Sequence, residues 1–274
     1  EAALIDRHPE YNMSDRKLLH LIDLERGVIN INGIECELLD KSYPTIDPSD
    51  PYKLTDDEQA IINHFHSSFI NSEKLKKHVY FLLQKGSLYL ARNNNLMFHA
   101  SIPLNEDGTF KKVKVMDEYY SGKRLLDRLD SLVQLACRKS TEISEEKQAS
   151  IDYMWYLWCG ADSPSFDKAK MATFERYLTT NKEVHKEEKG HYYKLQNDED
   201  VCINILKEFG IESEGSHIIN GHVPVKIKKG EHPVRANGKL LVIDGGFSKA
   251  YHSETGIAGY TLVYNSFGMQ LVQI

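Results

Sequence analysis

Several features that define whole classes of protein are missing from this sequence. No stretch holds about 18 uninterrupted apolar residues, so no membrane-spanning helix is expected. No signal peptide is recognisable at the N-terminus. Lysine and arginine (34) are outnumbered by aspartate and glutamate (40), and the net charge of −6 excludes a general nucleic-acid binder. We therefore expect neither a membrane nor a nucleic acid as a partner.

Cysteine is scarce, and its spacing carries no metal-binding pattern. The four cysteines are scattered along the chain without a C-x-x-C pair: Cys36, Cys137, Cys159 and Cys202. This usage excludes a zinc cluster of the C-x-x-C type. It favours free thiols in a reducing compartment, so we predict a cytoplasmic protein.

The composition that is present is typical of a soluble globular protein, with 274 residues of which 41% are hydrophobic and 27% charged. The chain begins at Glu1 rather than Met and ends within an apparent strand at Ile274. We interpret it as part of a longer protein. A partial fold exposes an apolar face, so we expect either a companion segment or association into a homo-oligomer.

The first part of the chain, residues 1–75, reads as a helix and hairpin region followed by a linker. Residues 13–25 are predicted to form a short helix, and residues 28–38 a hairpin that turns at Asn32-Gly33. A proline-rich loop then precedes a helix that starts with a capping box of Thr55 and Glu58.

The remainder, residues 76–274, mixes helices with short strands, which predicts an α/β fold. Amphipathic helices are expected at 123–138 and 198–211, and the polar stretch 185–198 is expected at the surface. Predicted strands cover these segments: 86–91, 95–101, 216–220, 223–227, 239–246, 256–266 and 268–274.

Two histidines follow predicted strands. His99 ends the run NLMFH, and His222 follows SHIIN-Gly221. α/β folds build their sites at strand ends, and neutral imidazole is a common ligand of Mn, Fe and Zn. Taken alone, each residue is more often a structural histidine bonded to backbone. As a pair they indicate a metal site, although two ligands do not hold a hydrolytic metal.

Three basic residues are candidates for binding an anionic substrate. Lys249 follows the turn Asp244-Gly245-Gly246, whose backbone N–H groups could face an anion. Lys226 lies in a basic segment and Arg176 in the run TFERY. The alternative interpretation is an exposed lysine or a solvated hairpin edge.

Several long segments together resemble one family. FHASIPLNEDGTFKKVK, YMWYLWCGADSPSF and KMATFERYL are three of them, followed by SHIINGHVPVKIKKGEHPVRANGKLLVIDGGFSKAY and TGIAGYTLVYNSFGMQLV. The chain resembles the bacterial class III fructose-1,6-bisphosphatases, which are calcineurin-like metallophosphatases. The resemblance implies part of a four-layer α-β-β-α sandwich with mixed sheets, residues 76–274 forming the C-terminal half of that domain.

The resemblance also implies a site and a reaction. Fructose 1,6-bisphosphate would be hydrolysed by a two-metal mechanism with Mn²⁺ as the expected ion, as a step of gluconeogenesis. His99 corresponds to the lone histidine motif and His222 to the histidine of G-H. Where some relatives have a second histidine in G-H-x-H, this chain has Pro224.

The other motifs of that family, G-D-x-x-D and G-N-H, are absent from these residues, and no catalytic acid is assigned. We expect the N-terminal portion of the same protein to supply them. Two alternatives stay open. The chain could be a non-catalytic module that binds a sugar phosphate or a partner, or a related metallophosphatase that acts on another phosphoester.

Overall fold

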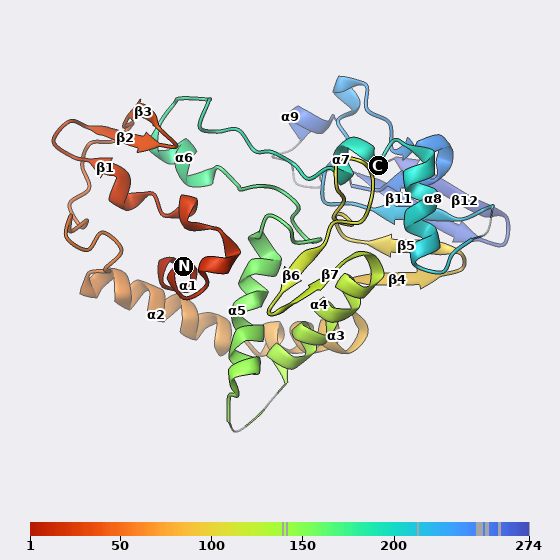
Figure 1. The fold of residues 1–274 in the computed structure, drawn as a ribbon, viewed down its shortest axis with the longest axis horizontal. Coiled ribbons are helices and arrows are strands. Elements are labelled where there is room, and N and C mark those ends of the chain that lie inside the picture. Colours follow the sequence, from red (N-terminus) through yellow and green to blue (C-terminus); the bar gives the residue numbers. More distant parts are fainter. Residues whose placement is uncertain are drawn as a thin grey trace. The chain divides into compact units, whose positions relative to one another are not determined.

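The computed structural model describes residues 1–138, 140, 142–212, 214–244, 249, 252–256 and 259–273. The chain divides into two compact units (Figure 1). The first contains Glu1–Gly86 and Lys168–Glu188, and the second contains Ser87–Asp167 and Lys189–Ile274. Among the described helices, none is both long and apolar enough to cross a membrane.

The first unit is built around a small antiparallel sheet in the order β1-β2-β3. A core of buried side chains packs on it, with Leu18, Ile29 and Leu178 among its members. The elements of the unit are α1 (Ala2–Arg7), β1 (Ile22–Asp23), β2 (Val28–Ile31), β3 (Ile34–Glu37), α2 (Asp56–Ile70), α3 (Glu73–Lys85) and α6 (Thr173–Leu178). Short 3-10 turns lie at Pro9–Tyr11, Ser14–Arg16 and Leu19–Leu21.

The predicted hairpin and the predicted capping box in this unit are confirmed. The hairpin turns at Asn32 and Gly33 with φ of 52° and 82°, as the predicted two-residue turn requires. Thr55 accepts a hydrogen bond from the Glu58 amide and donates its own amide to the Glu58 carboxylate.

The predicted helix at 13–25 is wrong. The segment forms 3-10 turns, and its last residues pair with β2 through Ile22↔Ile29. A helix of this length is marginal by itself, so burial of Leu18 in the core and pairing with β2 decide its conformation.

The second unit is a mixed sheet in the order β4-β5-β8-β10-β9, with helices and two small hairpins. An α/β fold with mixed parallel and antiparallel pairing is therefore confirmed. The strands are β4 (Tyr89–Arg92), β5 (Asn95–Phe98), β6 (Val113–Val115), β7 (Glu118–Tyr120), β8 (His217–Asn220), β9 (Val234–Arg235), β10 (Leu240–Val242), β11 (Tyr260–Asn265) and β12 (Gly268–Gln273). The helices are α4 (Gly122–Cys137), α5 (Glu145–Cys159), α7 (Tyr192–Leu195), α8 (Glu199–Glu208) and α9 (His252–Thr255), with 3-10 turns at Ile227–Lys229 and Ala236–Gly238.

The amphipathic helix predicted at 123–138 is confirmed as α4, which packs against α5 (Figure 1). One prediction in this unit is wrong. Residues 223–227 form no strand, because the chain bends at His222 and Val223 and enters a 3-10 turn at Ile227–Lys229. The polar stretch 185–198 lies mostly at the surface, as predicted, but it contains α7, whose Tyr192 is fully buried.

The compact units do not follow the predicted division at residue 75, which falls inside α3. Residues 168–188 pack with the first unit although they lie late in the sequence. The assignment of 76–274 to one metallophosphatase domain stays a prediction.

Candidate functional site

Three adjacent parallel strands bring chemically active side chains to one edge of the sheet. β5 pairs in parallel with β8 through Leu96↔Ile218, and β8 pairs in parallel with β10. His99 follows β5 directly, and His222 lies two residues after β8. Since the carboxyl ends of parallel strands share an edge, the two histidines meet although they lie far apart in the sequence.

The imidazole rings of His99 and His222 are in contact. His222 Nδ1 lies 3.0 Å from His99 Nε2, and the ring centroids are 4.8 Å apart at 69°. The Gly221 amide donates to the His99 carbonyl at 3.0 Å, which ties the two strand ends together. His222 has a φ of 66°, a left-handed conformation that a non-glycine residue adopts at a cost.

This arrangement has the geometry of a two-nitrogen metal site. With metal–nitrogen distances of about 2.0–2.1 Å, two ligands on adjacent corners of a coordination sphere lie about 3 Å apart. The same pair can instead share one proton, with one ring nitrogen donating to the other.

Asp244 is a third polar residue at this edge, and it was predicted only as part of an anion-binding turn, not as a site side chain. It lies two residues after β10, and a Cβ placed on Gly221 would lie 3.9 Å from its Oδ2. The apolar run Leu240–Val242 before Asp244 predicted a strand. Only the order of the strands in the sheet shows that Asp244 lies near Gly221. Across the described residues, no three His, Cys, Asp or Glu side chains form a group that could hold a metal.

Buried hydrogen bonds behind this edge hold the strand ends in place. Asn220 Nδ2 donates to the Ala100 carbonyl at 3.0 Å and to the Tyr192 hydroxyl at 2.8 Å. Asn220 is 3% exposed, so these bonds are shielded from water. They connect β8 to the segment that follows His99 and to α7.

A buried carboxyl, Asp167, lies in the same unit. Its backbone carbonyl accepts a hydrogen bond from the Gly190 amide at 2.8 Å. Burial raises the pKa of Asp167 to about 6, a rise that Asp162 adds to and that Ser101, Lys111 and His191 oppose. Its Oδ2 has no hydrogen-bond partner among the described residues. Ionising this carboxyl is therefore costly to the fold.

We expect Asp167→Asn to stabilise the protein at alkaline pH. The pKa of Asp167 is raised in the folded protein. The stability that its protonated carboxyl contributes is therefore fully present below about pH 4 and is lost as the pH rises through about 6. The neutral isostere should gain on the order of 2 kcal/mol at pH 8 and little at pH 4. Urea denaturation at both pH values measures this, and an equal effect at both would contradict a buried ionising carboxyl.

The predicted substrate-binding residues have different surroundings. Lys226 lies in the second unit, four residues after His222, and its amide donates to Glu231 Oε2 at 3.1 Å. Lys249 is exposed. Gly245 and Gly246 of the predicted anion-binding turn lie outside the described residues.

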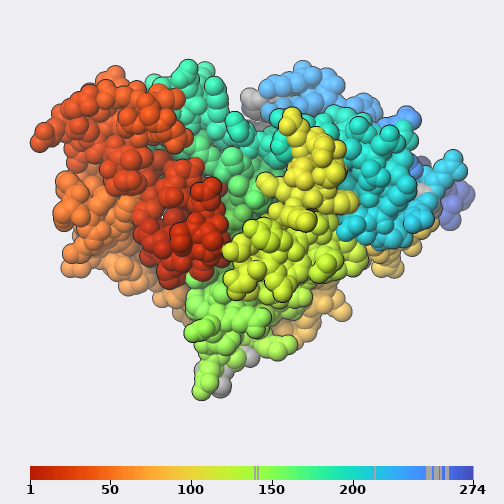
Figure 2. Space-filling model, in the orientation of Figure 1, coloured from red at the N-terminus to blue at the C-terminus, as the bar shows by residue number. Residues whose placement is uncertain are grey.

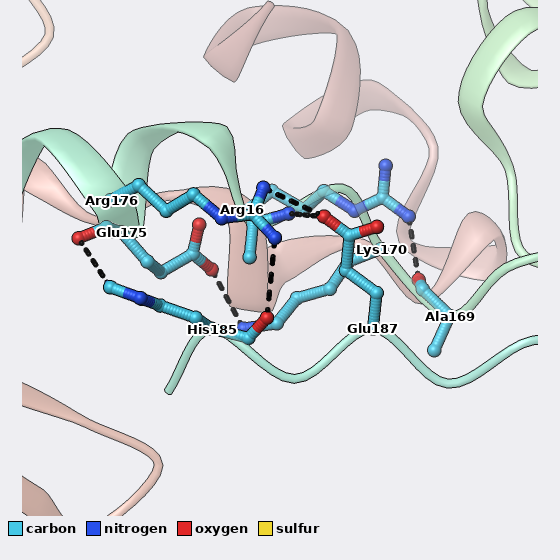
Figure 3. A network of polar contacts seen from close by, with 8 residues as sticks. Arg16, Ala169, Lys170, Glu175, Arg176, His185 and Glu187 are labelled. Atoms are coloured by element: carbon cyan, nitrogen blue, oxygen red, sulfur yellow. Dashed lines mark hydrogen bonds and ion pairs between the residues drawn. The ribbon is translucent and has the colours of Figure 1, made fainter. Parts of the chain in front are cut away.

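Arg176 belongs to a polar network within the first unit (Figure 3). Its guanidinium pairs with Glu187 Oε1 at 2.9 Å and donates to the His185 carbonyl. Burial alone would raise the pKa of Glu187, but the Ala172 amide and the charges of Lys168 and Arg176 hold it below its usual value. The charge of Arg176 is therefore already balanced by the Glu187 carboxylate. A role of Arg176 in substrate binding stays a prediction.

The fold and this edge define an α/β protein with a candidate metal site made by two imidazoles. Comparison with known proteins identifies the family. A family model described as Firmicute fructose-1,6-bisphosphatase matches residues 1–274. The chain belongs to this fructose-1,6-bisphosphatase family.

Curated relatives agree with this assignment. The chain is 59% identical over 273 residues to the class 3 fructose-1,6-bisphosphatase of Bacteroides fragilis and 58% identical to that of Bacteroides thetaiotaomicron, covering 100% of this chain in both cases. It is 56% identical to the enzyme of Clostridium acetobutylicum over 99% of this chain. The chain spans 41% of the length of each of these relatives. No solved structure matches it.

Proposed function

We propose that this chain is part of an enzyme that hydrolyses fructose 1,6-bisphosphate to fructose 6-phosphate and phosphate in the cytoplasm. The observation that carries the proposal is the contact of His99 and His222 at 3.0 Å, beyond two neighbouring parallel strands. The substrate is that of the similar class 3 fructose-1,6-bisphosphatases. The four cysteines are free thiols, which fits the predicted compartment.

The donor set suits a divalent transition metal, and we propose Mn²⁺. His99 Nε2 and His222 Nδ1 are imidazole nitrogens at a separation that suits one ion. When bound, a pair of divalent ions supplies Lewis acidity and a water nucleophile of lowered pKa. In that site, the role of the two histidines is to fix the position of one ion.

The remaining ligands belong, in this proposal, to the part of the enzyme that these 274 residues do not span. Two imidazoles do not hold a hydrolytic metal, and the relatives are longer than this chain. We propose that the mixed sheet of the second unit is one layer of a four-layer sandwich that the remaining part completes. The chain by itself would then bind sugar phosphate without turning it over.

Lys226 and Lys249 are the proposed contacts for the substrate phosphates. An ammonium group binds phosphate as a point charge. Lys226 lies only four residues after the candidate metal ligand His222. In the full-length protein, we expect Lys226→Ala to raise the KM for fructose 1,6-bisphosphate about tenfold. Steady-state kinetics with p-nitrophenyl phosphate, which lacks the second phosphate, should be unchanged.

Lys228→Ala is the matched control, because the Lys228 ammonium already donates to the Ser253 carbonyl at 3.0 Å. Equal KM values for the Lys226 variant and the wild type would remove Lys226 from the site. Turnover of p-nitrophenyl phosphate but not of fructose 1,6-bisphosphate by the full-length enzyme would support the related-phosphatase alternative.

A further inference from the structure

Helices α2 and α3 carry a large apolar surface that no other element of the first unit buries. Neither helix has a buried residue, although both begin with a side-chain cap, at Thr55 and at Ser72. Phe69 is 65% exposed and Leu82 is 63% exposed. Ten large apolar side chains of the two helices are exposed: Ile61, Ile62, Phe65, Phe69, Ile70, Leu75, Val79, Tyr80, Phe81 and Leu82. We call this set the α2–α3 face, and the surface of α2 appears in orange in Figure 2.

The spacing of these residues is that of buried helix faces. Ile61, Phe65 and Phe69 recur every four residues on α2, and Leu75, Val79 and Leu82 follow a spacing of four and three on α3. On α4, a helix with a comparable pattern, four of the five leucines are buried, and α5 packs against it. Helices of 13 and 15 residues are marginal in water without such packing. The α2–α3 face therefore has the character of an interface.

The length of the relatives indicates what covers this face. The chain accounts for 41% of each curated relative, so most of the family's polypeptide lies outside it. The polar positions of α3 are mainly basic, with Lys74, Lys76, Lys77 and Lys85 against Glu73. A matching surface would be apolar at its centre and acidic where it meets α3, whereas the first turn of α2 is acidic, with Asp56, Asp57 and Glu58.

We propose that the α2–α3 face is the docking surface for the part of a class 3 fructose-1,6-bisphosphatase that these 274 residues do not span. The inference rests on the proposed function, because that function makes the missing part a region of the same enzyme. The α2–α3 face is then the surface on which that region of the enzyme packs.

Thiol labelling tests this proposal. Cys137, the exposed native thiol, is first changed to serine, and Phe65→Cys, Val79→Cys and Lys77→Cys are then made singly. Position 77 is the matched control, since it lies on the side of α3 opposite to Leu75 and Val79. In the full-length enzyme, thiols at 65 and 79 should react about 100-fold more slowly than the thiol at 77. In the 274-residue chain all three should react at similar rates.

Similar rates at all three positions in the full-length enzyme would overturn the proposal. So would protection of positions 65 and 79 in the 274-residue chain that disappears on dilution, because the occupant would then be a second copy. Hydrolysis of fructose 1,6-bisphosphate is assayed on the same samples. An active enzyme with unprotected thiols refutes the docking surface alone, and an inactive enzyme with protected thiols refutes the activity alone.

Discussion

In the full-length enzyme, His222→Ala and His99→Ala should each lower kcat/KM for fructose 1,6-bisphosphate about 10³-fold, which corresponds to about 4 kcal/mol. The reason is geometric. The two ring nitrogens lie 3.0 Å apart, so removing either leaves one imidazole where two would hold the ion. Affinity for Mn²⁺, measured by calorimetry without substrate, should fall in parallel.

The fold should survive these two substitutions. His99 is exposed and His222 is partly exposed, so neither fills the core. His232→Ala is the matched control, because His232 is an exposed histidine of the same unit that bonds only nearby backbone. Wild-type Mn²⁺ affinity and turnover in the His222 variant would refute the ligand assignment.

Gly190→Ala should destabilise the protein by about 3 kcal/mol, the upper end of the usual cost of overpacking. A Cβ at position 190 would lie 1.9 Å from Asp167 Oδ1, closer than any real contact. Asp167 is 5% exposed, so its carboxyl has little room to move away. Urea denaturation of the full-length enzyme, followed by circular dichroism, measures the loss.

Asp167→Gly should restore most of that stability when combined with Gly190→Ala. It removes the clashing carboxyl, and glycine accepts the φ of 48° at position 167 without a steric penalty. The two substitutions should therefore be strongly coupled in a double-mutant cycle. Gly215→Ala is the control, since no atom of the described residues, apart from its chain neighbours, lies within 4 Å of its added Cβ. Additive effects at 167 and 190 would show that the buried carboxyl does not occupy the space beside Gly190.

The candidate site was partly predictable from sequence. His99 and His222 were each identifiable as a histidine after an apolar run, because that pattern is local. Their contact depends on β5 and β8 being parallel neighbours, a pairing between residues more than a hundred positions apart. The same long-range order places Asp244 beside Gly221. The ion pair of Arg176 with Glu187 could not be predicted from sequence either, because the loop between them must fold back to bring the two side chains together.

What the sequence by itself determined are the features that depend on a few consecutive residues. The Asn32-Gly33 turn, the Thr55 capping box and the amphipathic α4 formed as predicted, because turn geometry, capping and helical periodicity act within one element. Tertiary structure decided the rest. It converted residues 13–25 from a helix into turns and a strand, buried Asp167 against Gly190, and brought two imidazoles into contact. Each of these depends on packing between distant segments, and packing outweighs local preference wherever that preference is weak.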